Sequence, residues 1–260
     1  MGVTCIPMQI TFGDKTYDDS ITLSHREFYD KLADSAVLPV TSQINPAIYE
    51  TYLQNLTAKG DEVVVITLSS RLSGTCQSAR IAAENFPGKV FVVDSLNATV
   101  GARILLLRGL KLAQEGLSAA QIAQALDAEK SRIRLVAIID TLKYLKKGGR
   151  ISATVAFAGE VLGIKPAIEI VDGQVVMAGK ARGGKQGYAL MKQLIQKAGH
   201  IDWDKPIALV YSKSDDLLQQ FIENCPELWQ GHEIPPSYSL GCTIGTHIGP
   251  GAYGIAFFEK

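Results

Sequence analysis

The chain has few of the residues that mark whole classes of proteins. It contains only four cysteines among 260 residues, and these form neither a CxxC pair nor a Cys–His spacing typical of zinc. The scattered cysteines argue against a disulfide framework or a metal site. They indicate reduced thiols, as in a cytoplasmic protein.

An excess of charge of either sign is also missing. The 26 Lys and Arg residues balance the 26 Asp and Glu residues, and no nucleic-acid-binding motif is present. The apolar runs are too short or too interrupted to cross a membrane. The first residues, Met1–Cys5, lack the basic and apolar regions of a signal peptide. We therefore expect a soluble cytoplasmic protein without a nucleic-acid partner and without stable membrane insertion.

Residues that build a folded core are abundant, since 47% of the chain is hydrophobic and only 20% is charged. Residues 1–130 alternate β-branched runs with helical patterns, which predicts an α/β domain with a parallel sheet covered by helices on both faces. Residues 131–260 add a hairpin signal at Asp172-Gly173, which predicts a second, mixed α/β domain with antiparallel strands. The expected strands are 3–12, 62–68, 89–95, 134–140, 166–171, 206–211 and 252–258, and the expected helices are 24–35, 46–58, 76–86, 98–115, 118–130, 152–162, 184–198 and 214–224.

One loop has the composition of a binding site. Ser69–Thr75 joins the end of the strand at 62–68 to the start of the next helix, and it is rich in hydroxyl groups. Open α/β sheets bind ligands at such edges, and the N–H groups of a helix N-terminus favour an anion. The alternative is that Ser73 or Thr75 simply caps the helix, which is the commoner role of such residues.

Two segments almost match nucleotide-binding motifs, and both fail. Residues 249–254 fit G-x-G-x-x-G, but a strand follows them and no helix can receive a pyrophosphate. Residues 179–186 approach the phosphate-binding loop of nucleotide hydrolases, but Gln186 replaces the Ser or Thr that would hold magnesium. We therefore expect no ATP binding by the isolated chain.

A serine or cysteine acyl hydrolase is the alternative function. Ser73 or Cys76 would be the nucleophile and His247 the base. The G-x-S-x-G elbow of such enzymes is absent, and Cys76 falls within a predicted helix. His247 lies in a glycine-rich segment, which allows close approach of the backbone to a ligand or to another loop.

Taken together, six segments resemble the DegV family of fatty-acid-binding proteins, the lipid-carrying subunits of bacterial fatty acid kinase. The resemblance runs from about residue 11 to the end of the chain, and the order of the segments makes it specific. They are Thr11–Tyr17 (TFGDKTY), Leu38–Gln43 (LPVTSQ), Ser69–Thr75 (SSRLSGT), Leu142–Ser152 (LKYLKKGGRIS), Ile164–Pro166 (IKP) and Gly245–Ala252 (GTHIGPGA).

The resemblance implies a two-domain DegV-like fold with a long-chain fatty acid, such as palmitate, in an apolar tunnel at the domain junction. It implies no cofactor and no catalysis by this chain, which would present the carboxylate to a kinase subunit that forms an acyl phosphate. The implied residues are Thr41, Ser73 and His247 at the carboxylate, Ser70, Gly74 and Thr75 in the head-group loop, and Arg150 for docking to the kinase.

Burial of an acyl chain agrees with this implication. Each buried methylene contributes about 0.8 kcal/mol, so a C16 tail offers on the order of 10 kcal/mol before the cost of association. Residues 104–107, 155–158 and 161–164 could line the tunnel or belong to an ordinary core. Family members usually begin with a further strand ending in Asp-Ser-Thr. This chain begins after that point, so we expect about 20 fewer residues and a gap or a new edge in the sheet.

Overall fold

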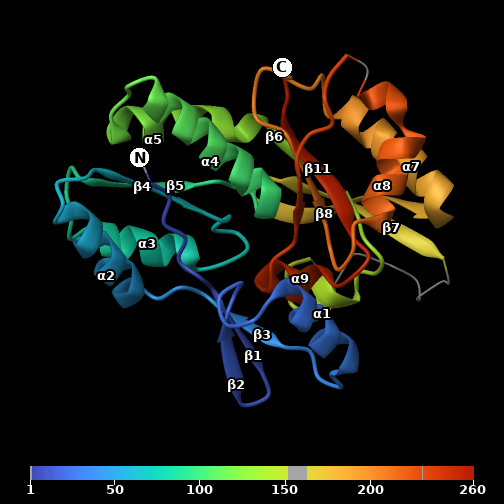
Figure 1. The fold of residues 1–260 in the computed structure, drawn as a ribbon, viewed down its shortest axis with the longest axis horizontal. Helices are drawn as coiled ribbons and strands as arrows, with labels where there is room; N and C mark the ends of the chain where they lie inside the picture. Colours follow the sequence, from blue (N-terminus) through green and yellow to red (C-terminus); the bar gives the residue numbers. More distant parts are fainter. Residues whose placement is uncertain (1, 152–162, 230) are drawn as a thin grey trace.

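The computed structural model describes residues 2–151, 163–229 and 231–260, and its largest sheet has six strands (Figure 1). Their order is β10-β9-β11-β6-β7-β8. Neighbouring strands are antiparallel except β9 and β10, so the mixed sheet predicted for the second half of the chain is confirmed. The strands are β6 (Ile133–Ile138), β7 (Ile164–Val171), β8 (Gln174–Arg182), β9 (Ala208–Tyr211), β10 (Ser237–Ser239) and β11 (Tyr253–Phe258).

Alternate residues of this sheet enter two separate cores, because successive side chains of a strand point to opposite faces. Val136 and Ile138 face α7 (Gly183–Lys197) and α8 (Asp216–Asn224), whereas Leu135 and Ala137 pack with α4 (Thr99–Gln114) on the other face. The face toward α4 is the one that carries the site described below.

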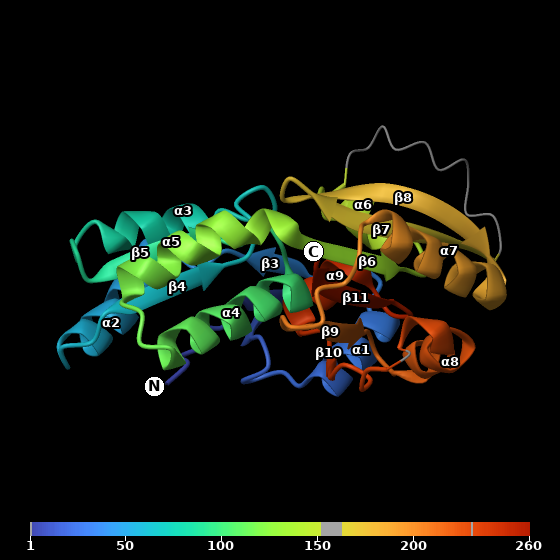
Figure 2. The same ribbon diagram turned by 90° about the horizontal axis from the view of Figure 1, so that it is seen from above.

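A second sheet consists of the parallel strands β4 and β5. In Figure 1 helices α2 and α3 lie below this pair and helices α4 and α5 lie above it. The prediction of parallel strands covered on both faces is therefore confirmed. Figure 2 shows the β4–β5 pair and its helices toward one end of the molecule, and the large sheet with α7 and α8 toward the other. The bounds are β4 (Val63–Thr67), β5 (Val90–Asp94), α2 (Pro46–Thr57), α3 (Thr75–Ala83) and α5 (Ala119–Glu129).

The third sheet is a small antiparallel one with the order β2-β1-β3. It packs with α1 against α9, near the C-terminus, and α9 also contacts α6. Residues from the two ends of the chain thus meet, and the division at residue 130 stays a prediction. The elements are β1 (Gln9–Phe12), β2 (Lys15–Asp18), β3 (Val40–Ser42), α1 (His25–Asp34), α6 (Lys143–Lys147) and α9 (Cys242–Ile248), with short 3-10 turns at Lys130–Arg132 and Pro226–Leu228.

Local sequence signals explain where several helices begin. Ser24 and Ser118 each form a capping box with the residue three positions on, and the Asn45 side chain caps α2, whose first residue is proline. The expected strands and helices leave out β2, β10, α6 and α9, and β3 lies in a stretch, 38–43, that the proline at position 39 predicts only to be extended. The strand predicted at 3–12 is confined to Gln9–Phe12. The predicted helix at 152–162 lies outside the described residues.

None of the helices in the described part of the chain has both the length and the apolar character needed to cross a membrane.

Candidate functional site

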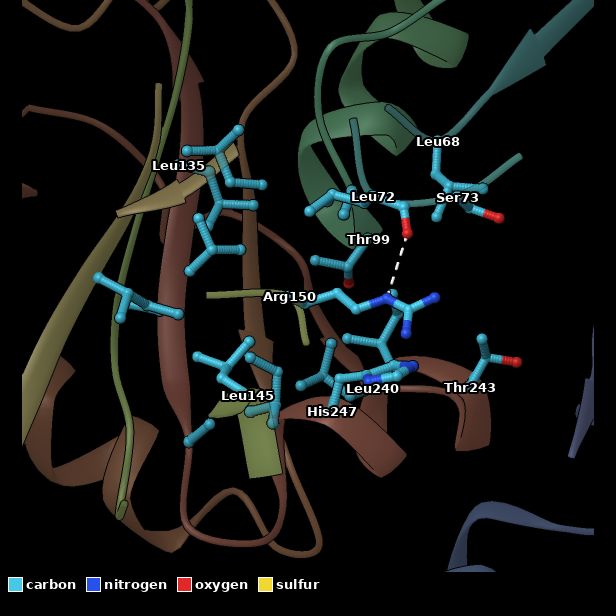
Figure 3. Close-up of a pocket in the computed structure, with 18 of the residues that line it drawn as sticks. Leu68, Leu72, Ser73, Thr99, Leu135, Leu145, Arg150, Leu240, Thr243 and His247 are labelled. Atoms are coloured by element: carbon cyan, nitrogen blue, oxygen red, sulfur yellow. Dashed lines mark hydrogen bonds between the residues drawn. The ribbon is translucent and has the colours of Figure 1, made fainter. Parts of the chain in front are cut away.

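A cavity with about 880 Å³ of empty space, part of it open to solvent, lies over the α4 face of the large sheet. Figure 3 shows its polar side chains gathered on one side and aliphatic side chains filling the other. The polar lining residues are Thr41, Ser42, Gln43, Ser73, Thr99, Arg150, Thr243 and His247. The apolar ones include Leu68, Leu72, Leu135, Ala137, Ile139, Leu145, Ile168, Ile170, Val175, Val210, Leu240, Ile244 and Ile248.

Thr41 and His247, which are 206 positions apart in the sequence, meet at the polar end of this cavity. Thr41 Oγ1 lies 2.9 Å from His247 Nε2. β3 supplies Thr41 and α9 supplies His247, because the small sheet packs against that helix. The second ring nitrogen, His247 Nδ1, is buried and has no hydrogen-bond partner among the described residues. Such a group is costly to leave unpaired. This nitrogen lies against Gly148, where a Cβ would collide with it.

The electrostatic surroundings keep His247 neutral. Burial, together with the positive charge of Arg150, lowers the pKa of His247 from 6.5 to about 4. Both effects disfavour the imidazolium. A carboxylate placed beside the ring would oppose them, because an opposite charge nearby favours the charged form of a histidine.

Ser73 lines the same cavity, and its hydroxyl belongs to a local network. Ser73 Oγ lies 2.9 Å from Thr75 Oγ1 and accepts a hydrogen bond from the Thr75 N–H. Thr75 Oγ1 also accepts from the Ile44 N–H, which ties the loop to the segment after Thr41. The N-cap of α3 is Gly74, with no side-chain cap. Among the described residues, the capping role considered for Ser73 is therefore limited to one hydrogen bond, which its hydroxyl accepts from the Thr75 N–H.

The other predicted loop residues do not line the cavity. Ser70 is exposed, and its N–H group donates a hydrogen bond to the buried Asp94 carboxylate. Gly74 is required for a close approach, because a Cβ there would collide with the Gln43 side chain. Thr75 is buried beneath Ser73 and supports it.

The structure places Arg150 in the wall of the cavity, half-buried. Its Nε donates to the Leu72 carbonyl at 3.2 Å (Figure 3). Its Nη1 donates to the Gly148 carbonyl. The bond to Leu72 links the segment after α6 to the loop that carries Ser73. A role of Arg150 in docking to a kinase stays a prediction, whereas its position also puts a positive charge next to the polar end.

Sequence reasoning missed four polar lining residues, Ser42, Gln43, Thr99 and Thr243. Thr99 begins α4 with a φ of 45°, a conformation that is a genuine outlier for a β-branched residue. Strain of this kind often accumulates at functional sites. No motif in the sequence signals a left-handed threonine. Gln43 follows directly on the Thr41-Ser42 segment, so its proximity could have been inferred.

Of the proposed tunnel segments, residues 104–107 do not line the cavity. Residues 104–107 belong to α4, where Ile104 and Leu105 are fully buried in the core. Residues 155–158 and 161–162 lie outside the described residues. Among the described residues, much of the apolar lining comes from the strands of the large sheet and from α9.

The hydrolase alternative requires a nucleophile paired with His247, and the structure pairs this histidine with Thr41. Ser73 is bonded to Thr75, and Cys76 is fully buried. Within the described ranges, no group of three or more His, Cys, Asp and Glu side chains is placed to hold a metal ion.

Known proteins resemble this chain over its whole length. The family described as "Uncharacterised protein, DegV family" matches residues 1–260. A DegV domain-containing protein of Caldanaerobacter subterraneus is 31% identical, over 100% of this chain and 92% of its own length.

Solved structures of DegV family proteins also resemble this chain. A fatty-acid-binding DegV family protein from Thermus thermophilus superposes with a TM-score of 0.88 at 30% identity, over 98% of this chain and 91% of that one. A DegV family protein from Eubacterium eligens, loaded with heptadecanoic acid, gives a TM-score of 0.84 at 25% identity, over 98% and 92% of the two chains. Each of these matches extends over nearly the full length of the two chains compared. This chain belongs to the DegV family.

Proposed function

We propose that this protein binds one long-chain fatty acid, such as palmitate, in the cavity over the large sheet. The acyl chain lies against the aliphatic wall, and the carboxylate lies at the end that holds Thr41, Ser73 and His247. The observation that carries the proposal is the pairing of a buried, half-satisfied His247 with Thr41 at one end of an otherwise apolar cavity.

The chemistry of the two ends suits such a ligand. A carboxylate cannot be buried without hydrogen-bond donors, and the hydroxyl groups, the His247 ring and the Arg150 guanidinium supply them. Those donors fix the orientation of the ligand. The tail supplies most of the affinity, at about 0.8 kcal/mol per methylene removed from water. No cofactor takes part in this binding.

Lipid extraction tests this function. Protein purified from a bacterial host is denatured, and the organic phase is examined by mass spectrometry for fatty acids in a stoichiometric amount. We expect saturated or monounsaturated long-chain acids. Repeated recovery of no acid, together with no uptake of added palmitate by the delipidated protein, would contradict the proposal.

We also propose that the protein is a non-catalytic, cytoplasmic partner of a fatty acid kinase, to which it presents the carboxylate. The resemblance of Leu142–Ser152 to the family segment that docks the kinase supports this step. The exposed Lys143 and Lys147 of α6, close in sequence to Arg150, offer cations to an acidic partner surface.

A kinase assay separates the two roles that Arg150 could have. Palmitate-loaded protein is mixed with a fatty acid kinase and ATP, and acyl phosphate formation is compared for wild type, Arg150→Ala and Lys147→Ala. Loss of phosphorylation with unchanged palmitate binding in Arg150→Ala supports docking. Loss of binding itself assigns Arg150 to the head group, and unchanged phosphorylation in both variants contradicts docking through this segment.

A further inference from the structure

A second cavity lies behind the apolar wall of the first one. It has about 990 Å³ of empty space and is partly open to solvent. Two residues, Leu135 and Ile170, line both cavities. They come from neighbouring strands of the large sheet, and they are the place where the two cavities adjoin.

The register of the strands places these two side chains next to each other at the end of a ladder. β6 and β7 are antiparallel and their ladder ends at the pair Val136 and Glu169, so Leu135 and Ile170 are the first residues beyond it and point to the other face. On the far side of β7, Ile170 pairs with Val175, which also lines the first cavity. Three branched side chains therefore stand in a row across β6, β7 and β8.

The next row is lower on β6 and on its other neighbour, β11. Ala137 pairs with Ile168 on one side and with Gly254 on the other. Gly254 has no room for a side chain, because a Cβ would lie 2.6 Å from the Val136 carbonyl oxygen. On β6 the floor of the first cavity is thus low at Ala137 and rises at Leu135, whereas β7 presents an isoleucine in both rows, Ile168 and Ile170. Figure 3 shows Leu135 on the side of the cavity away from Ser73.

We propose that Leu135 and Ile170 are the stop for the acyl chain and set the longest fatty acid that this protein accepts. This inference rests on the proposed function, and it adds a specificity determinant to it. A chain that begins at Thr41 and His247 runs over Ala137 and meets the Leu135–Ile170 pair with its methyl end. Beyond the pair, charged residues such as Arg134 and Glu169 line the second cavity, which adds a polar penalty to the steric one.

Shortening either side chain joins the two cavities and lengthens the path. Each methylene that gains an apolar environment increases affinity roughly fourfold. The polar lining beyond the stop reduces this gain, so we expect the ratio of bound eicosanoic to bound palmitic acid to rise on the order of tenfold in Leu135→Ala and in Ile170→Ala.

A competition experiment measures this ratio. Delipidated protein is offered an equimolar mixture of saturated acids from dodecanoic to docosanoic, and the bound fraction is quantified by mass spectrometry. Ile170→Phe is the opposite change, and it should shift the preference toward tetradecanoic acid. Leu240→Ala is the matched control, because Leu240 is a buried leucine that lines the first cavity only. It should weaken binding of all chain lengths without shifting the preferred one.

The outcomes distinguish this inference from the function on which it rests. An unchanged length profile in both alanine variants, or a wild type that already binds docosanoic acid as well as palmitic acid, overturns the stop. A wild type that binds no acid of any length overturns the proposed function. Ile170 is only partly buried, so its variants keep the test decisive even where Leu135→Ala fails to fold.

Discussion

The His247 imidazole illustrates how a single residue connects stability to binding. Its pKa is held at about 4 in the folded chain, mainly by burial and then by the charge of Arg150, whereas its ordinary value is 6.5. Between pH 4 and pH 6.5, His247 binds a proton in the unfolded chain but not in the native protein. Stability contributed by the neutral ring is therefore complete above pH 6.5 and is lost as the pH falls toward 4.

We expect protonation of His247 at low pH to reduce the free energy of unfolding by up to about 3 kcal/mol. The free energy of unfolding is measured by denaturant titration at several pH values for wild type and His247→Gln. Other carboxyl groups titrate in both proteins, so the informative quantity is the difference between them. As the pH falls, the free energy of unfolding should decrease more for wild type than for His247→Gln. Parallel curves for the two proteins would show that the histidine is not buried in a neutral form.

The two hydroxyl groups at the polar end make a second residue-scale prediction. Thr41→Ala and Ser73→Ala should each weaken palmitate binding by about 1–3 kcal/mol, the usual cost of leaving a buried acceptor unpaired. Ser70→Ala is the matched control, since Ser70 belongs to the same loop but its side chain does not line the cavity. Binding isotherms of the delipidated proteins decide the matter, and equal affinity in all three variants would remove both hydroxyls from the site.

At this scale the sequence identified part of the site and missed part of it. The family motifs contained Thr41, Ser73 and His247, and all three line the cavity. Thr99 was missed, because a threonine does not itself favour the left-handed backbone that it adopts at the start of α4. Ser70 and Gly74 belong to the right loop, but the direction in which a loop residue points depends on bonds such as the one from the Ser70 N–H to Asp94.

Among the elements, α9 is the one whose position matters most for the site. Its glycine-rich sequence does not predict a helix, yet residues 242–248 form one. Gly245 is needed for packing, because a Cβ would lie 2.6 Å from Phe28 Cε1 of α1. The prediction that glycine allows a close approach was sound, but the approaching group is a neighbouring helix. Contacts of this kind join distant segments, and a single sequence does not reveal them.

Asp19 anchors the start of α9. Its two carboxylate oxygens accept hydrogen bonds from the Cys242 and Thr243 N–H groups, at 2.9 and 2.8 Å. Burial alone would raise the pKa of Asp19, but these bonds, with help from Ser20, lower it. The carboxylate therefore joins the loop after β2 to the helix that carries His247.

We expect Asp19→Asn to destabilise the protein by about 1–3 kcal/mol, because the amide presents an N–H group to one of the two backbone donors. Since α9 positions His247, palmitate affinity should fall as well, although Asp19 does not line the cavity. Asp14→Asn, an exposed aspartate in the turn between β1 and β2, is the control. Thermal unfolding and palmitate binding of the two variants are compared, and an Asp19→Asn protein with normal affinity would show that the anchor does not position the histidine.

For the whole molecule, the important question is what holds the two α/β parts in register around the cavity. Lining residues come from both sides of position 130, so the site depends on how these parts meet. One contact between them joins the turn of the β7–β8 hairpin to the end of β4. Ser69 Oγ donates to the Gly173 carbonyl at 2.7 Å, and the serine is fully buried. The sequence predicted this hairpin turn correctly, but nothing in it indicated that the turn docks on the loop before Ser73.

This contact makes Gly173 sensitive to substitution for two reasons that can be separated. Its φ is +78°, which disfavours any side chain, and a Cβ would collide with Ser69 Oγ and lie 3.2 Å from Arg71 Cγ. Gly13 has a φ of +56° but nothing within 4 Å of the position that a Cβ would take, so Gly13→Ala carries the backbone penalty alone. Both variants should lose about 1 kcal/mol from backbone strain. Gly173→Ala should lose more, and it should also bind palmitate more weakly, because the displaced turn moves the loop that carries Ser73. Equal losses of stability in the two variants, with unchanged binding, would mean that this contact does not hold the two parts together.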